Sequence, residues 1–178
     1  MPRTPPPRTY TRDAAFPDAM TVRPIGVVRS PHEERHGTPR QAAVPADPAL
    51  RPDEAARIEL FPDVLPPEAV RDLQGFDLVW VLAWLHLNDG WNPTVVPPRG
   101  PRTRRSLLAT RAPHRPNPIG LSAARLVRVE GRVLHLARLD LLDGTPILDV
   151  KPYVPSVDAF PDARAGWLHE LESATGPD

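Results

Sequence analysis

The sequence predicts a mostly β fold: an antiparallel β-barrel with a few short helices. Two observations favour it. Short apolar runs of strand length recur between turn signals along the chain. Strands do not alternate with long helices, and no segment repeats another. A mostly antiparallel sheet with barrel-like closure is therefore the expected architecture.

The first strands are expected at residues 22–30 and 56–60. A short helix is expected at residues 66–73, because proline is tolerated and glutamate is favourable in a first helical turn. Near the end of the chain, residues 163–173 predict a C-terminal helix.

Residues 78–85 form a continuous apolar run that contains Trp80 and Trp84. Such a run is typical of a strand buried on both faces, or of a barrel strand at a subunit contact. The two tryptophans are expected to serve core packing, as large aromatic side chains in apolar strands usually do. Further on, residues 121–129 and 132–139 flank a Glu-Gly pair and predict a hairpin.

The 178 residues divide into three predicted parts. Residues 1–20 predict a disordered tail rich in proline and arginine, residues 21–160 one β-barrel domain, and residues 161–178 a helix and tail. The start has no apolar signal-peptide core, and no run approaches the length of a membrane span. A cytoplasmic protein without a membrane segment is therefore expected.

Charge and cysteine content narrow the function classes. Lys+Arg and Asp+Glu are balanced at 22 each, so any RNA contact needs a local patch rather than an overall basic field. Cysteine is absent, which excludes disulfides and thiolate metal sites. The candidate basic patch is a cluster of arginines: Arg99, Arg102, Arg104, Arg105, Arg111 and Arg115.

Residues 110–120, with the sequence TRAPHRPNPIG, are the most informative segment of the chain. Three prolines fix φ there and keep the preceding residues extended. Gly120 closes the segment and permits a positive φ or a close backbone approach. Rigid polar loops on a β scaffold commonly carry binding and catalytic groups, which makes this loop a candidate site.

A second segment, residues 139–153, reads LDLLDGTPILDVKPY. Asp143 and Gly144 predict a tight turn between two apolar runs. Taken singly, Asp140, Asp143 and Asp149 are each explained as turn and strand-end residues. Together with the first loop, they form a candidate polar site.

These two segments, with IGVVRSP at residues 25–31 and GFDLVWVLAWLH at residues 75–86, resemble the TsaA-like or TrmO family of tRNA methyltransferases. The resemblance covers roughly residues 22–160 in order. It implies the same barrel architecture, and the use of S-adenosylmethionine to methylate N6-threonylcarbamoyladenosine beside the tRNA anticodon. It also implies a homodimer with the cofactor near the subunit interface.

The resemblance implies cofactor contacts from several loops: Gln41, Ala42, Ala43, His86, Leu87, Arg111, Leu121, Leu139, Asp140, Leu141, Leu142 and Asp143. Where the family usually continues with Pro-Gly after residue 41, this chain has Ala42 and Ala43. On the acceptor side the candidates are Arg115, Asn117, Lys151 and Tyr153, which offer charge or hydrogen bonds. Tyr153 and Trp91 can also stack on a base.

No glycine-rich turn between a strand and a helix is present, so the cofactor is expected outside a Rossmann fold. Methyl transfer depends mainly on positioning and needs no metal. His114, Asp149 and Tyr153 stay open as the group that helps remove the acceptor proton. Two alternatives also stay open: a methyltransferase for a small-molecule acceptor, and a non-catalytic S-adenosylmethionine-binding protein.

Residues 32–36, HEERH, match the zinc-protease pattern H-E-x-x-H. That pattern binds zinc only on a helix, where both histidines share a face. Pro31 precedes the match and Gly37 follows it, and the flanks have no helical apolar period. A charged surface loop without metal is therefore expected.

Overall fold

The computed structural model describes residues 16–34, 56–98, 100–137 and 139–169. Its elements, in chain order, are β1 (Gly26–Arg29), β2 (Arg57–Leu60), the 3₁₀-helices η2 (Pro67–Ala69) and η3 (Arg71–Gly75), β3 (Leu78–Trp84), β4 (Thr94–Val95), β5 (Arg105–Ser106), the 3₁₀-helix η4 (Leu107–Ala109), β6 (Ile119–Glu130), β7 (Val133–Leu136), β8 (Pro146–Pro152) and α1 (Pro155–Asp158). The prediction of a mostly β chain with a few short helices is confirmed.

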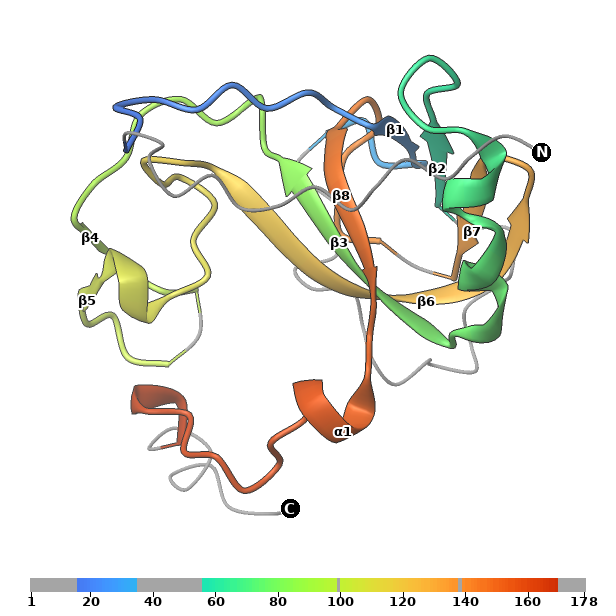
Figure 1. Cartoon of the computed structure of the whole chain (residues 1–178). Coiled ribbons are helices and arrows are strands. Elements are labelled where there is room, and N and C mark those ends of the chain that lie inside the picture. Colours follow the sequence, from blue (N-terminus) through green and yellow to red (C-terminus); the bar gives the residue numbers. More distant parts are fainter. Residues whose placement is uncertain (1–15, 35–55, 99, 138, 170–178) are drawn as a thin grey trace.

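Six strands pair in the order β1-β2-β7-β6-β3-β8 (Figure 1), and β8 pairs back to β1 to close the ring. Every pairing in the ring is antiparallel. At the seam, Gly26 lies opposite Ile147 and Val27 lies opposite Pro146. The sheet is therefore continuous, and β3 lies between β6 and β8.

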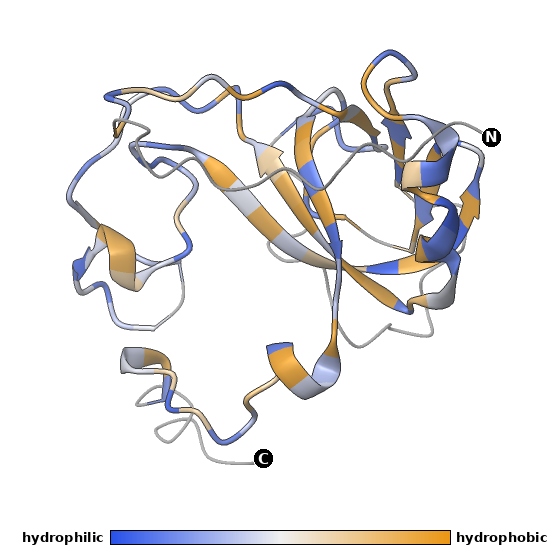
Figure 2. Cartoon of the chain, in the orientation of Figure 1, coloured by the Kyte–Doolittle hydropathy of each residue, from blue (hydrophilic) through white to orange (hydrophobic). Residues whose placement is uncertain are grey.

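The core fills the inside of this ring with small and medium apolar side chains. Alternate residues of each strand point inward. Figure 2 shows alternating apolar and polar positions along β8, whereas β3 is apolar along most of its length. The largest fully buried side chains are Ile58, Leu134, Leu136, Leu139, Ile147, Val28, Val79 and Val81.

Strand β3 is buried on one face only. Val79, Val81 and Ala83 face inward and are fully buried, while Trp80 and Trp84 face outward and are half-buried. The expectation that both tryptophans pack in the core is wrong. A small barrel has little interior volume, so the inward positions of β3 carry valine and alanine and the indoles lie outside.

Most predicted elements exist, with altered ends. The first strand starts at Gly26, after Pro24, which has no N–H to donate. The helix expected at residues 66–73 is a pair of 3₁₀-helices, because the amides of Ala69 and Val70 bond three residues back. The Asp-Gly turn is confirmed, with φ of 74° at Gly144.

Of the C-terminal helix expected at residues 163–173, residues 163–166 are non-helical and residues 167–169 are helical. Residues 170–173 lie outside the described residues. The HEERH segment is non-helical at residues 32–34, and its last two residues also lie outside the described residues. Among the residues described, no helix is long and apolar enough to cross a membrane.

Between β3 and β6 the chain leaves the barrel and forms an arm, defined here as residues 86–118. Figure 1 shows the arm to the left of the barrel, with the two-stranded β4–β5 sheet at its outer end. The short helix η4 follows β5, and the proline-rich loop then leads back to β6. Neither β4, β5 nor η4 was predicted, because two- and three-residue elements leave no periodic pattern.

On the outer surface of the barrel, the Glu59 carboxylate on β2 accepts hydrogen bonds from Arg57 at 3.0 Å and from Arg29 at 2.9 Å. These bonds, the one from Arg57 first, hold the pKa of Glu59 below its usual value. The bond from Arg29 joins β1 to β2, beside the ladder that pairs the same strands.

Gly26 is the position at which this ladder tolerates no side chain. A Cβ there would lie 2.7 Å from the backbone oxygen of Glu59, so β1 and β2 would have to separate. We expect Gly26→Ala to destabilise the protein by about 1–3 kcal/mol, the usual cost of overpacking. Urea unfolding followed by circular dichroism measures this change.

Gly75→Ala is the matched control, because a Cβ at Gly75 has no atom within 4 Å and that glycine has no positive φ. We expect its stability to stay within about 0.5 kcal/mol of the parent chain. Equal destabilisation by both substitutions would contradict the steric argument at the β1–β2 ladder.

Candidate functional site

The proline-rich loop is held in shape by its own arginine. The Nη1 atom of Arg115 donates to the carbonyl of Thr110 at 3.0 Å, and to those of Leu107 and Ala112 at 3.4 Å each. The Thr110 hydroxyl also donates to the Leu107 carbonyl at 2.8 Å. Arg115 was predicted to face the acceptor, but these contacts direct at least part of its guanidinium into the loop.

At the base of the arm, the loop packs against the end of β3. The amide of Leu85 donates to the carbonyl of Pro118 at 2.8 Å. A Cβ on Gly120 would lie 3.1 Å from the Leu85 side chain and 3.7 Å from that of Leu141. The φ of Gly120 is not positive, so close packing rather than a turn explains this glycine.

The contacts at Gly120 bring three sequence motifs together at one end of the barrel. His86 and Leu87 follow β3, Leu121 is the third residue of β6, and residues 139–143 lie beside them through Leu141. In the same region the hydroxyl of Ser122 donates to the Asp140 carboxylate at 2.5 Å. Several predicted cofactor residues thus share one neighbourhood.

Not every member of this group presents its side chain to a ligand. Leu139 and Leu141 are buried in the barrel core, so only their backbone could reach a bound molecule. Asp143 accepts a hydrogen bond from the amide of Ser30 at 3.0 Å, and its own amide donates to the carbonyl of His32 at 2.8 Å. Asp143 therefore anchors the end of β1 to the turn before β8.

A second group lies on the outer face of β8. Lys151 stands opposite Trp80 and Asp149 opposite Leu82, and the Lys151 ammonium pairs with Asp149 at 2.6 Å. The ring of Tyr153 lies 5.2 Å from that of Trp80. The predicted acceptor residues Lys151 and Tyr153 thus flank one half-buried indole.

Trp80 is fixed by α1. Its indole N–H donates a hydrogen bond to the carboxylate of Asp158 at 3.1 Å. The same carboxylate also accepts a hydrogen bond from the amide of Val154 at 2.8 Å. The helix and the Lys-Pro-Tyr segment therefore cover the Trp80 ring together. Asp158 was not predicted, and neither was Ser122, although Ser122 directly follows the predicted cofactor residue Leu121.

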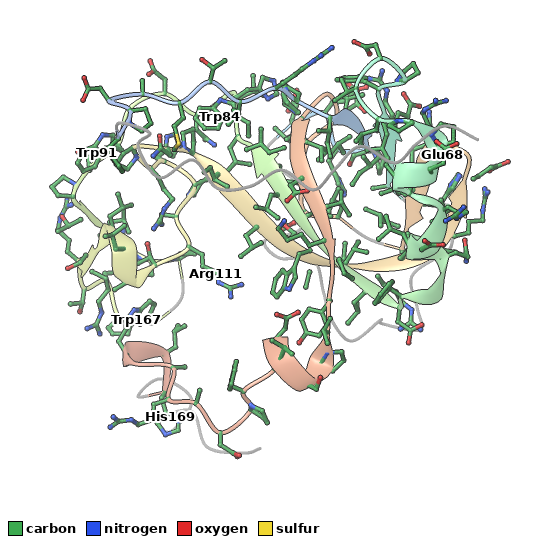
Figure 3. All side chains as sticks on the ribbon, viewed as in Figure 1. Glu68, Trp84, Trp91, Arg111, Trp167 and His169 are labelled. Carbon is green, nitrogen blue, oxygen red and sulfur yellow. The ribbon has the colours of Figure 1, made fainter. Side chains whose placement is uncertain are left out.

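Arg111 and Asn117 remain available. Arg111 is exposed and makes no hydrogen bond or ion pair with any described residue, and the side chain of exposed Asn117 likewise has no such contact. Figure 3 shows the Arg111 side chain on the flank of the arm that faces the barrel strands. Gln41, Ala42 and Ala43, also predicted to bind the cofactor, lie outside the described residues.

The C-terminal segment returns to the arm. The Trp167 indole N–H donates to the carbonyl of Ala109 at 2.8 Å, and the Arg105 guanidinium lies 5.1 Å from the centre of the Trp167 ring. Figure 3 shows Trp167 beside the outer end of the arm. Two carbonyls of η4 are thus bonded to other segments, that of Ala109 to Trp167 and that of Leu107 to Arg115.

Within the described ranges, no group of three or more histidine and acidic side chains lies close enough to hold a metal ion. The site therefore offers arginine, lysine, carboxylate and aromatic groups, which suit the binding and positioning of a polar organic molecule.

We expect Arg115→Ala to loosen the loop, because three carbonyls lose a charged donor. Bonds of this kind contribute about 1.5–3 kcal/mol, so the amides of Leu107 and Thr110 should exchange with solvent roughly 10- to 100-fold faster. Hydrogen–deuterium exchange measures this directly. Arg111→Ala is the control and should leave both amides unchanged. Equal effects of the two substitutions would show that Arg115 does not hold the loop.

Comparisons with known proteins agree with this architecture. Residues 27–159 match the family model "tRNA-methyltransferase O N-terminal domain". The chain is 40% identical over 157 residues to the tRNA (adenine(37)-N6)-methyltransferase of Escherichia coli, covering 84% of this chain and 64% of that protein. It is 41% identical over 141 residues to a Methanothermobacter thermautotrophicus protein named "Probable S-adenosyl-L-methionine-binding protein", covering 79% of this chain and 95% of the relative.

Among solved structures, the crystal structure of TrmO from Pseudomonas aeruginosa is similar with a TM-score of 0.65 and 40% sequence identity. The match covers 83% of this chain and 62% of that chain. The chain therefore spans a little under two thirds of the length of the E. coli and P. aeruginosa relatives. The resemblance inferred from the sequence motifs is confirmed, and the chain belongs to the tRNA-methyltransferase O N-terminal domain family.

Proposed function

We propose that the chain is an S-adenosylmethionine-dependent methyltransferase that methylates N6-threonylcarbamoyladenosine beside the tRNA anticodon. The observation that carries this proposal is family membership over residues 27–159, together with 40% identity to the E. coli tRNA (adenine(37)-N6)-methyltransferase. A Rattus norvegicus protein of the same name is 33% identical over 162 residues. With tRNA as the acceptor, we also propose that the chain works in the cytoplasm.

The described residues offer the groups that the cofactor needs. One carboxylate oxygen of Asp140 accepts a hydrogen bond from Ser122, and the carboxylate can also accept hydrogen bonds from ribose hydroxyls. Arg111, without a partner among the described residues, can hold the methionine carboxylate in a bidentate pair. The exposed side chains of His86, Leu87 and Leu121 can pack against adenine. When bound, S-adenosylmethionine would supply an electrophilic methyl group.

The remaining groups suit the acceptor side. Lys151 and Tyr153 flank Trp80 on the outer face of β3 and β8, where they offer a cation, a hydroxyl and two aromatic rings. Asn117, two residues before β6, adds an exposed amide without a hydrogen-bond partner among the described residues. Arg115, bonded to its own loop, acts here as a positioning residue rather than an acceptor contact. Catalysis would then depend mainly on orientation of the acceptor nitrogen.

The test is methyl transfer by the purified full chain, followed by nucleoside mass spectrometry. We expect a methyl group on tRNA that carries threonylcarbamoyladenosine, none on the same tRNA without the threonylcarbamoyl group, and full activity in EDTA. Lack of any methylated nucleoside, with S-adenosylmethionine binding intact in calorimetry, would reject the tRNA proposal and leave a binding protein.

Two substitutions separate the cofactor side from the acceptor side in that assay. Arg111→Ala should weaken S-adenosylmethionine binding roughly 10- to 100-fold, the usual effect of removing a charged partner. Lys151→Ala should keep the cofactor affinity and lower turnover. If both variants lost cofactor affinity equally, the assignment of these two residues to different ligands would be wrong.

We also propose a homodimer. On the outer face, Leu82 of β3 lies opposite Leu121 of β6, and Trp84 lies opposite Ile119. Leu121 and Ile119 are 55% and 45% exposed, so the described residues leave an apolar patch on two adjacent strands uncovered. We infer that a second copy of the chain covers this patch, since symmetric dimers are the commonest oligomers. Leu121 belongs to this patch and is also a predicted cofactor residue, so the partner would lie close to the cofactor site.

Light scattering should therefore give a mass near twice 19.7 kDa. Leu82→Glu should yield monomers that no longer bind S-adenosylmethionine, because a charge would be buried in the interface. Val127→Glu is the control: Val127 is 54% exposed, on the part of β6 that runs beside β7, and the variant should remain dimeric. A parent chain that is monomeric and still binds S-adenosylmethionine would contradict the dimer.

A further inference from the structure

The charge of this neutral chain is unevenly distributed. Residues 86–118, the arm, contain six arginines and one acidic residue, Asp89. Figure 2 shows the arm as largely hydrophilic around the short apolar helix η4. The arm therefore has a strong positive charge that the overall composition conceals.

None of the arm's described arginines forms an ion pair with a described carboxylate. The ion pairs between arginine and carboxylate among the described residues involve Arg23, Arg29, Arg57, Arg71 and Arg128, none of them on the arm. Arg102 is exposed and makes no hydrogen bond with any described residue, Arg104 donates only to Thr94, and Arg105 lies against Trp167. These guanidinium groups are free to bind anions.

A hollow of about 460 Å³ lies at the base of the arm, lined by Asp89, Gly90, Trp91, Asn92 and His114. Its two walls are joined by a contact of 3.3 Å between Nδ1 of His114 and the carbonyl of Asp89. Trp91 is 51% exposed, whereas the other three tryptophans are half-buried. None of the contacts described above for the barrel involves Trp91, so they do not explain why its indole is exposed.

These groups match what unpaired RNA requires. Single-stranded nucleic acid is bound by aromatic rings that stack on bases and by cations that follow the phosphates. The hollow adds the amide of Asn92, the carboxylate of Asp89 and the imidazole of His114, which can bond to base edges. The hollow lies close to the cofactor residues, because Asp89 follows His86 and Leu87 and His114 follows Arg111.

We propose that the arm is a binding site for single-stranded RNA, in which Trp91 stacks on one unpaired base in the hollow and Arg102, Arg104 and Arg105 hold the flanking phosphates. The proposal rests on the proposed function, because the acceptor adenosine lies in the anticodon loop. It assigns to this arm the recognition of a loop nucleotide beside the one that is methylated.

The experiment measures binding of a labelled anticodon stem–loop RNA to the full chain by fluorescence anisotropy, without cofactor, over a series of salt concentrations. Trp91→Ala should weaken binding roughly 5- to 150-fold, the effect of losing one stacked base. Trp91→Phe should restore most of the affinity. Arg102→Ala should weaken binding and reduce the slope of log affinity against log salt by roughly 0.7–0.9, the effect of one lost phosphate contact.

Matched controls separate the arm from general effects. Phe160→Ala removes another exposed aromatic ring, and Arg71→Ala removes the same charge from η3; both should bind like the parent chain. A duplex RNA with the sequence of the stem alone should bind Trp91→Ala and the parent chain equally. Parent-like stem–loop binding by Trp91→Ala, or equal losses for stem and stem–loop, would overturn the proposal.

Fluorescence gives a second measurement that does not depend on the alanine variant's folding. Stem–loop RNA should quench the tryptophan emission of the parent chain and quench that of Trp91→Phe much less; equal quenching would overturn the stacking. Methyl transfer is scored separately. Trp91-dependent loop binding without methyl transfer would reject the proposed function alone, and methyl transfer with Trp91-independent binding would reject the arm alone.

Discussion

The narrow interior of the six-stranded ring is the constraint on which the rest of the structure depends. Its volume is taken by side chains such as Val79, Val81 and Ala83, so no space remains inside for a ligand or for large polar groups. The indole of Trp80 and the charges of Lys151 and Asp149 must then lie on the outer face. Any chemistry therefore takes place on the outside of the barrel and where its strands end.

An outer site needs walls, and this chain supplies them from segments that leave the barrel. The arm is kept in shape by Arg115 within the loop and by Trp167 from the C-terminal segment. On the other flank, α1 holds Trp80 through Asp158. Polar contacts between distant segments thus stabilise the walls of the site, whereas apolar packing stabilises the barrel.

The sequence predicted β3, the β6–β7 hairpin and the Asp-Gly turn, because these segments have strong local patterns. It misplaced Trp80, since an apolar run does not reveal which face of a strand points inward. The contacts that shape the site could not be predicted from the sequence, for a different reason. Trp80 and Asp158 are 78 positions apart, Trp167 and Ala109 are 58 apart, and Ser122 and Asp140 are 18 apart. Each pair is brought together by tertiary packing, which a local sequence pattern does not reveal.

The seam between β1 and β8 has a consequence for folding kinetics. Ser30 and Asp143, which bond beside it, are 113 positions apart, whereas β6 and β7 are joined by a short hairpin turn. Closing a long loop costs more entropy than closing a hairpin, so we expect the hairpin to form early and the seam late. Until it forms, β1 and β8 present unpaired edges to other chains. The ring's last and shortest ladder would then govern how long a newly made chain stays prone to aggregation.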